Sequence, residues 1–102
     1  MEYTDSDQVQ RALNAADCIN NPAYQSAMAL LKTQIVDQWK DCPVRDIEGQ
    51  RLLLQLAKLA EKFDGILAGY VQAGKLAQHR IDLDNERNES MGARVLRRSF
   101  AR

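Results

Sequence analysis

The chain is poor in the residue types that form catalytic, metal and disulfide sites. His79 is its only histidine, and its two cysteines, Cys18 and Cys42, are far apart and form no C-x-x-C motif. A structural zinc site needs about four nitrogen and sulfur ligands at characteristic spacing, so we expect two reduced, free thiols and no metal. Nothing near His79 in the sequence completes a catalytic triad. We expect this histidine at the surface, where a long helix ends.

Two short motifs fail at their most informative positions. The Gly-Lys pair within residues 73–77 lacks the rest of a phosphate-binding loop. The acidic residues of 82–86 alternate like the start of a calcium loop, but Arg87 and Ala93 stand where the turn glycine and the last glutamate belong. We therefore predict that the protein is not an enzyme and uses no cofactor.

Long uncharged apolar runs are also missing. No stretch approaches the roughly 18 residues of a membrane span, and the N-terminus lacks the basic region and apolar core of a secretion signal. We expect a cytoplasmic protein without membrane contact. The formal net charge is zero, but residues 1–50 hold four basic and eight acidic side chains, whereas residues 94–102 hold four arginines and no acid.

What the chain has in abundance is helical periodicity, with apolar residues at 45 %. Thr4 and Asp7 have the spacing of a capping box, which predicts a first helix directly after Thr4. Asn21 suits the N-cap of a second helix and Pro22 its first position. The apolar spacing then predicts that this second helix runs from about residue 22 to 40.

A third, much longer helix is predicted after Pro43, from Asp46 as its N-cap to about residue 79. Its apolar residues recur at alternating spacings of four and three, the pattern of a coiled-coil seam. This stripe, the expected core or oligomer seam, consists of Leu52, Leu56, Leu59, Phe63, Ile66 and Tyr70. A second apolar stripe beside it is interrupted by Asp64.

These elements predict an all-α fold, a helical hairpin with one long helix in the C-terminal half and a short N-terminal helix, in coiled-coil-like packing. The two shorter helices together match the predicted length of the long one at about 1.5 Å per residue. The long helix is then a spine covered end to end. Its remaining apolar width favours contact with a second copy or another protein.

Small residues form a ridge along the long helix at Gly65, Gly69, Ala73 and Ala77. Glycine inside a helix costs about 1 kcal/mol relative to alanine, so the ridge indicates a close approach of another backbone, at a helix crossing or a self-association face. The alternative is that these residues lie opposite a bulky side chain of the same chain, such as Trp39 or Tyr24.

The hairpin bend and the C-terminus supply two further candidate contacts. One interpretation is that Trp39 and Arg45, at the bend, form a surface that anchors a partner. The alternative is that Trp39 closes the core. Residues 1–80 are predicted to be the helical domain and residues 81–102 a polar linker followed by a basic amphipathic tail. The residues of this partner-docking tail are Arg94, Val95, Leu96, Arg97, Arg98, Phe100 and Arg102.

Three interpretations of the tail stay open. Its arginines and apolar residues suit docking onto the acidic N-terminal half of a neighbouring copy. The same arginines could neutralise phosphates of a nucleic acid in a salt-dependent way, which we do not favour. The third interpretation is a solvated tail without a partner.

Residues 39–78 carry a resemblance to a known group of proteins. The sequence has Trp39-Lys40, then Pro-x-Arg-Asp-x-Glu-Gly at 43–49, a leucine-rich helix, and Gly-Lys-x-Ala at 74–77. In this it resembles small, uncharacterised helical proteins of tailed bacteriophages whose genes lie near those for the phage head. The resemblance implies a role in the virion or its assembly and supplies no catalytic residues.

We therefore expect a small, non-enzymatic structural or assembly protein of a bacteriophage particle, acting by helix-mediated self-association and tail docking. Its expected partners are itself and other phage structural proteins, in the cytoplasm of the bacterial host or in the virion. Two alternatives stay open. One is a phage-encoded inhibitor or regulator of a host protein, of the anti-defence type. The other is a DNA-binding packaging component that resembles a small terminase subunit.

Overall fold

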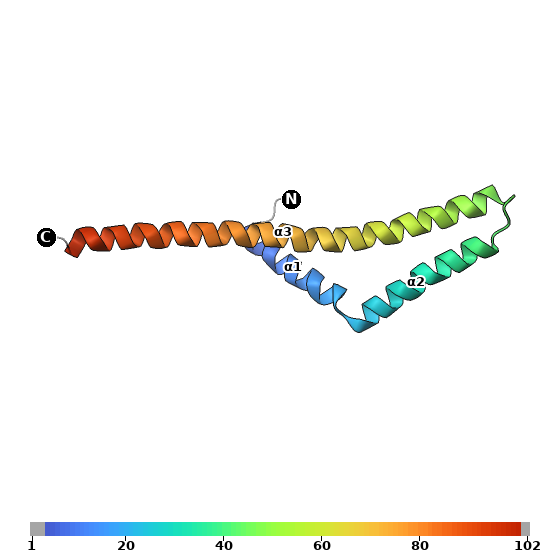
Figure 1. The fold of residues 1–102 in the computed structure, drawn as a ribbon, viewed down its shortest axis with the longest axis horizontal. Helices are drawn as coiled ribbons and strands as arrows, with labels where there is room; N and C mark the ends of the chain where they lie inside the picture. Colours follow the sequence, from blue (N-terminus) through green and yellow to red (C-terminus); the bar gives the residue numbers. More distant parts are fainter. Residues whose placement is uncertain (1–3, 101–102) are drawn as a thin grey trace.

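Three helices make up the computed structural model, which describes the backbone of residues 4–100 and the side chains up to residue 89. They are α1 (Asp5–Ile19), α2 (Pro22–Asp41) and α3 (Ile47–Phe100), and no strand occurs in the described range. The predicted all-α fold is confirmed. The molecule is a rod of 87 × 26 × 19 Å (Figure 1).

The predicted helix starts are confirmed by their hydrogen bonds. The Asp7 amide donates to the Thr4 hydroxyl over 3.1 Å, and the Thr4 amide donates to the Asp7 carboxylate over 3.3 Å, which completes a capping box. The side chain of Asn21 accepts from the amides of the first turn of α2, with Pro22 in the first helical position. Asp46 accepts from the Gly49 amide over 3.0 Å at the start of α3.

The end of α3 differs from the prediction. We expected the helix to stop near residue 79 and a polar linker to follow, but α3 continues as one helix of 54 residues to Phe100. At about 1.5 Å per residue this is roughly 80 Å. The polar composition of residues 82–89 is that of a fully exposed helix, which needs no apolar face. Polarity alone therefore did not mark a break.

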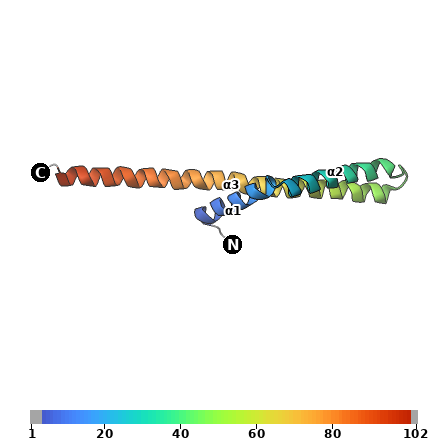
Figure 2. The same cartoon turned by 90° about the horizontal axis from the view of Figure 1, so that it is seen from below.

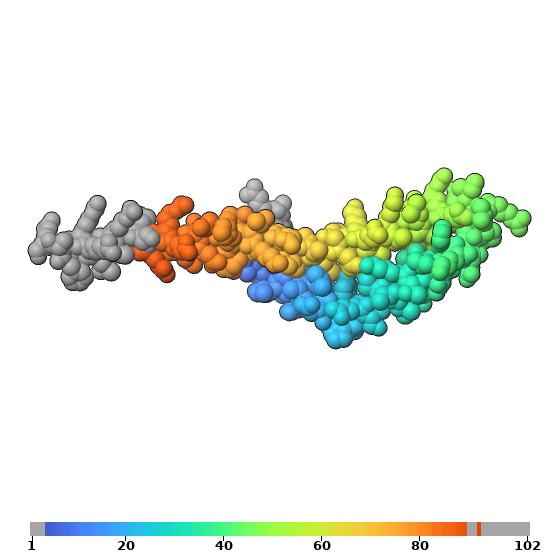
Figure 3. Space-filling view, viewed as in Figure 1, coloured from blue at the N-terminus to red at the C-terminus, as the bar shows by residue number. Residues whose placement is uncertain are grey.

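Both shorter helices run antiparallel to α3 on one side of it. α2 folds back along the first part of α3 through the bend at 42–46, and α1 continues beyond an elbow at residues 20–21 (Figures 1 and 2). The far end of α1 is tied to α3 by an ion pair between Arg80 and Asp5, 2.9 Å apart. Cover by the shorter helices thus ends near residue 80, and the orange part of α3 beyond it is uncovered in Figure 3.

The core is small. The side chains buried in the described range are Ala15, Ile35, Ala60 and Ala77. Gly74 is buried as well, at the point where α1 crosses α3, and a Cβ atom there would lie only 2.1 Å from the Cβ of Ala12. Small residues thus let α1 approach closely, while larger apolar side chains stay on the surface.

Candidate interaction surface

The predicted seam of α3 lies mostly on the surface of the single chain. Its first five members, between Leu52 and Ile66, are 44–63 % exposed. Tyr70, the sixth, is half-buried, and the guanidinium of Arg11 lies 4.1 Å from the centre of its ring. The inner stripe, interrupted by Asp64, faces the shorter helices instead, with Ala60 buried in it. The seam is therefore not the core of one chain.

The exposed seam borders a hollow between α2 and α3. This hollow has a volume of about 310 Å³, and its lining is apolar: Met28, Leu31, Ile35, Leu56, Leu59, Ala60 and Phe63. We call this side of the hairpin the stripe face, formed by the exposed seam with Met28 and Leu31. Hollows of this kind arise because α2 and α3 touch through few side chains along their length, leaving apolar walls that face solvent.

A second apolar face lies on the other side of the hairpin. At 100° per residue, Leu54 lies about 160° around α3 from Leu52 and Leu56. Leu54 lines a hollow of about 190 Å³ together with Val36 and Trp39. Trp39 is 55 % exposed, so it does not close the core of the single chain. We call this side the tryptophan face.

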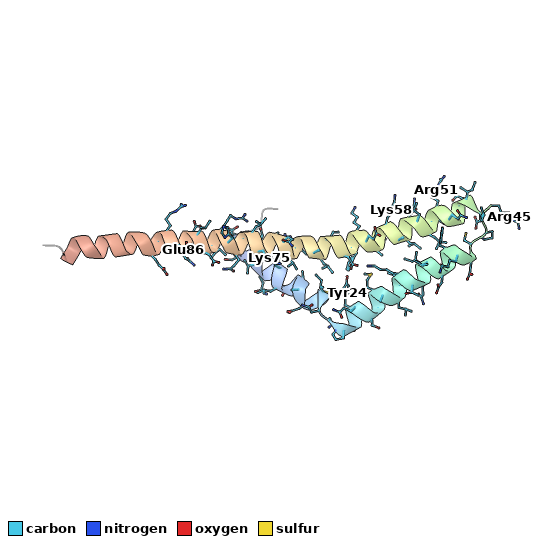
Figure 4. The ribbon with its side chains drawn as sticks, in the orientation of Figure 1. Tyr24, Arg45, Arg51, Lys58, Lys75 and Glu86 are labelled. Carbon is cyan, nitrogen blue, oxygen red and sulfur yellow. The ribbon has the colours of Figure 1, made fainter. Side chains whose placement is uncertain are left out.

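The two remaining sides of the hairpin are charged, with opposite signs. Exposed Arg51, Lys58 and Lys62 follow the outer side of α3 and form the basic edge, and Arg51 and Lys58 point away from α2 in Figure 4. Exposed Asp37 and Asp41 on the outer side of α2 form the acidic edge. Exposed Lys40, one turn after Val36, lies on the tryptophan-face side of this edge. Of the five residues on these two edges, Arg51 forms an ion pair within the described part of the chain, a 4.0 Å contact with Glu48. The hairpin is thus a layer with two apolar faces and two oppositely charged edges.

A polar link fixes α2 against α3. The Tyr24 hydroxyl donates to one oxygen of Asp64, and the Lys32 ammonium lies 2.6 Å from the other. The hydrogen bond from Lys32, followed by that from Tyr24, lowers the pKa of Asp64. The hydrogen bond to Asp64 and, next, desolvation raise the pKa of Tyr24 to about 12. The sequence marked Asp64 only as an interruption, although Tyr24 and Lys32, eight residues apart on one side of α2, could have indicated its partners.

The residues of the small-residue ridge have different surroundings in the structure. A Cβ atom at Gly65 or Gly69 would meet nothing within 4 Å, so neither lies opposite Trp39 or Tyr24. Ala73 is half-buried at the edge of the α1 crossing. Ala77, the last member of the ridge, is fully buried. Close packing at the α1 crossing depends on Gly74, which lies outside the predicted ridge. Its position next to Ala73 and Ala77 was the available signal.

The remaining predicted residues lie at the bend and in the tail. Arg45 is exposed at the bend (Figure 4). The residues Arg94, Val95, Leu96, Arg97, Arg98 and Phe100 belong to the last turns of α3, where the described part is the backbone, and Arg102 lies outside the described residues. Their proposed docking stays a prediction.

The amount of exposed surface is large for a chain of this mass. A folded monomer of 11.6 kDa exposes about 5,800 Å², but this chain exposes 8559 Å². The difference of about 2,700 Å² exceeds the roughly 800 Å² that each partner buries in a standard interface. It reflects the elongated shape of the molecule, a rod of 87 × 26 × 19 Å.

The two cysteines belong to no disulfide or metal site within the described residues. Cys18 and Cys42 are free thiols, and no three His, Cys, Asp or Glu side chains in the described residues could together hold a metal ion. None of the helices within residues 4–100 is both long and apolar enough to cross a membrane. Desolvation, and then the charge of Asp46, raises the pKa of Cys42, which keeps this thiol protonated and unreactive at neutral pH.

Comparison with protein-family models, with curated proteins and with solved structures found no match.

Proposed function

We propose that the protein is a small structural or assembly protein that acts by binding further copies of itself. The observation that carries this proposal is the exposed seam, five large apolar side chains in a regular four-and-three spacing on a chain with about 2,700 Å² of surplus surface. Contiguous exposed apolar surface on a water-soluble protein is typical of an interaction site. A seam of this spacing is suited to another helix.

The two apolar faces support assembly rather than a single encounter. The stripe face and the tryptophan face lie on opposite sides of the hairpin, so one copy can contact two neighbours at once. A chain with one apolar face would stop at a closed pair, whereas two different faces permit a larger array. This geometry suits a component that builds or lines a larger particle.

The resemblance of residues 39–78 to small proteins of tailed bacteriophages supports placing this assembly in a phage particle, formed in the cytoplasm of the bacterial host. Other structural proteins of the phage are then further partners. Mass spectrometry of purified particles and assembly intermediates tests this placement, and absence of the chain from both would contradict it.

Self-association through the stripe face is tested with two matched substitutions. Leu59 is 63 % exposed on the stripe face and Leu76 is 61 % exposed on the outer side of α3. Leu59→Asp should lower the oligomer mass toward that of the monomer, because a buried, unpaired carboxylate disfavours the interface. Leu76→Asp should leave the mass unchanged. Sedimentation velocity of both variants, with helicity from circular dichroism as a folding control, decides the matter. Equal masses for both variants would contradict the proposal.

A further inference from the structure

We infer that a second copy packs on the stripe face in parallel orientation, with its α2 lying over α3 of the first copy. This arrangement rests on the proposed self-association and specifies the partner, the face and the direction. The observation that selects it is the opposite charge of the two edges that border the apolar faces.

The choice lies between two ways of placing two identical hairpins face to face. In one, the two-fold axis runs across the helices, so α3 lies over the partner's α3 in antiparallel direction and the two basic edges lie side by side. In the other, the axis runs along the helices, so α3 lies over the partner's α2 and each basic edge borders an acidic edge. Like charges brought together disfavour the first arrangement, and complementary charges favour the second.

The positions of the charged side chains along the rod axis agree with the second arrangement. Within one hairpin, Tyr24 lies level with Asp64, and Trp39 and Leu53 line the same hollow. This register puts Asp41 level with Arg51, and Asp37 about one turn further along. A two-fold axis along the rod keeps every residue at its level. Asp41 of one copy therefore comes beside Arg51 of the other, and Asp37 comes between Arg51 and Lys58.

Helix direction and packing support the same arrangement. Each α3 then has two antiparallel neighbours, its own α2 and that of the second copy, as in a four-helix bundle. The exposed seam from Leu52 to Ile66 meets Met28 and Leu31 of the second copy, which wall the hollow of about 310 Å³. The stripe face is the better docking face because its seam is longer, while Lys32 and Glu61 line a hollow beside Val36 on the other side.

The direction of the pair is measured with one spin label per chain at Arg45, introduced as Arg45→Cys with Cys18→Ala and Cys42→Ala. In the parallel pair both bends lie at the same end, and the shortest label-to-label distance should be below about 30 Å, since packed helix axes are about 10 Å apart. In the antiparallel pair the bends lie at opposite ends, about 40 Å or more apart at 1.5 Å per residue. The triple variant without label must keep the wild-type oligomer mass.

Charge reversal at Arg51 is an independent test, because the two arrangements predict opposite changes in the affinity of association. Arg51→Asp should weaken association up to about tenfold at low salt in the parallel pair, because it faces Asp41, and adding Asp41→Arg should restore it. In the antiparallel pair Arg51→Asp should strengthen association, because it relieves repulsion between basic edges. A long distance with tighter association would overturn this arrangement alone. A monomeric wild-type chain would overturn the self-association itself.

Discussion

The phenolic hydroxyl of Tyr24 donates a hydrogen bond to the carboxylate of Asp64, joining α2 and α3 across 40 positions of sequence. Lys32 holds the second oxygen of the same carboxylate from 2.6 Å. This group is the polar tie of an otherwise apolar hairpin, and Phe63 packs beside it with its ring centre 6.2 Å from that of Tyr24. Its protonation therefore controls how firmly α2 is held.

Acid should weaken the hairpin through Asp64. Its pKa is lowered in the folded state by Lys32 and Tyr24, so its contribution is present above the ordinary aspartate pKa of about 3.9 and is lost as the pH falls through the lower, folded value. Asp64→Asn should make the free energy of unfolding less dependent on pH below about 4. Urea unfolding at several pH values measures this, with Asp37→Asn as a control. Equal acid dependence in both variants would contradict the assignment.

Alkaline pH should weaken the hairpin through ionisation of Tyr24. Its pKa is raised to about 12 in the folded state, so its contribution is complete below the ordinary tyrosine pKa of about 10 and is lost as the pH rises from there to the folded value. Tyr24→Phe should remove this alkaline loss. The absorbance of tyrosinate in wild type and variant measures it. A wild-type chain whose three tyrosines all titrate near 10 would speak against the hydrogen bond.

The glycines should respond oppositely to alanine. Gly74→Ala places a Cβ atom 2.1 Å from that of Ala12 and should destabilise the fold by about 1–3 kcal/mol. Gly69→Ala meets nothing within 4 Å in one chain and should raise helix stability by up to about 1 kcal/mol. Thermal unfolding of both variants at low concentration tests the difference. If Gly74→Ala proved as stable as Gly69→Ala, the close crossing of α1 and α3 would be wrong.

The rate of amide hydrogen exchange should increase along α3 beyond about residue 81. Amides of residues 60–77 lie under α1 and α2, whereas the side chains of residues 82–89 are exposed. A helix without tertiary packing is marginally stable, so amides of 82–89 should exchange much faster. Mass spectrometry of peptides after brief labelling, on chain dilute enough to be monomeric, reads this out. Equal protection of both segments would contradict the arrangement of the single chain, in which residues 82–89 are exposed.

Trp39 should report contact at the tryptophan face. It is the only tryptophan and is 55 % exposed in one chain. If neighbouring copies cover this face, its emission should shift to shorter wavelength as concentration and mass rise together. Val36→Asp on the same face should suppress the shift. Emission that stays constant while the mass increases would restrict assembly to the stripe face.

The sequence predicted the helices of the hairpin well because their signals are local. Capping residues such as Thr4 and Asn21 satisfy amides within the same turn, and apolar spacing marks each helix face. It did not predict which of the two stripes of α3 is covered, because both are apolar and only the placement of α2 decides between them. The continuation of α3 past residue 81 was missed for a related reason, since an exposed helix has no periodic signature.

The candidate surface was foreseen in part. Leu52, Leu56 and Leu59 were identified as a core or a seam, and their exposure in one chain removes the first possibility. Tyr24 and Lys32 offered a signal for the tie at Asp64, but the placement of α2, and not the local sequence, decides which α2 residues come opposite Asp64. Gly74 likewise depends on α1 crossing at that level.

The most direct measurement is the mass of the unmodified full chain in solution, by sedimentation equilibrium from about 1 to 100 μM at moderate salt. An interface of the standard size typically gives dissociation constants within or below this range. We predict a mass of at least twice the 11.6 kDa of one chain over most of it. A mass that stays at 11.6 kDa up to the highest concentration would contradict self-association and the role in assembly built on it.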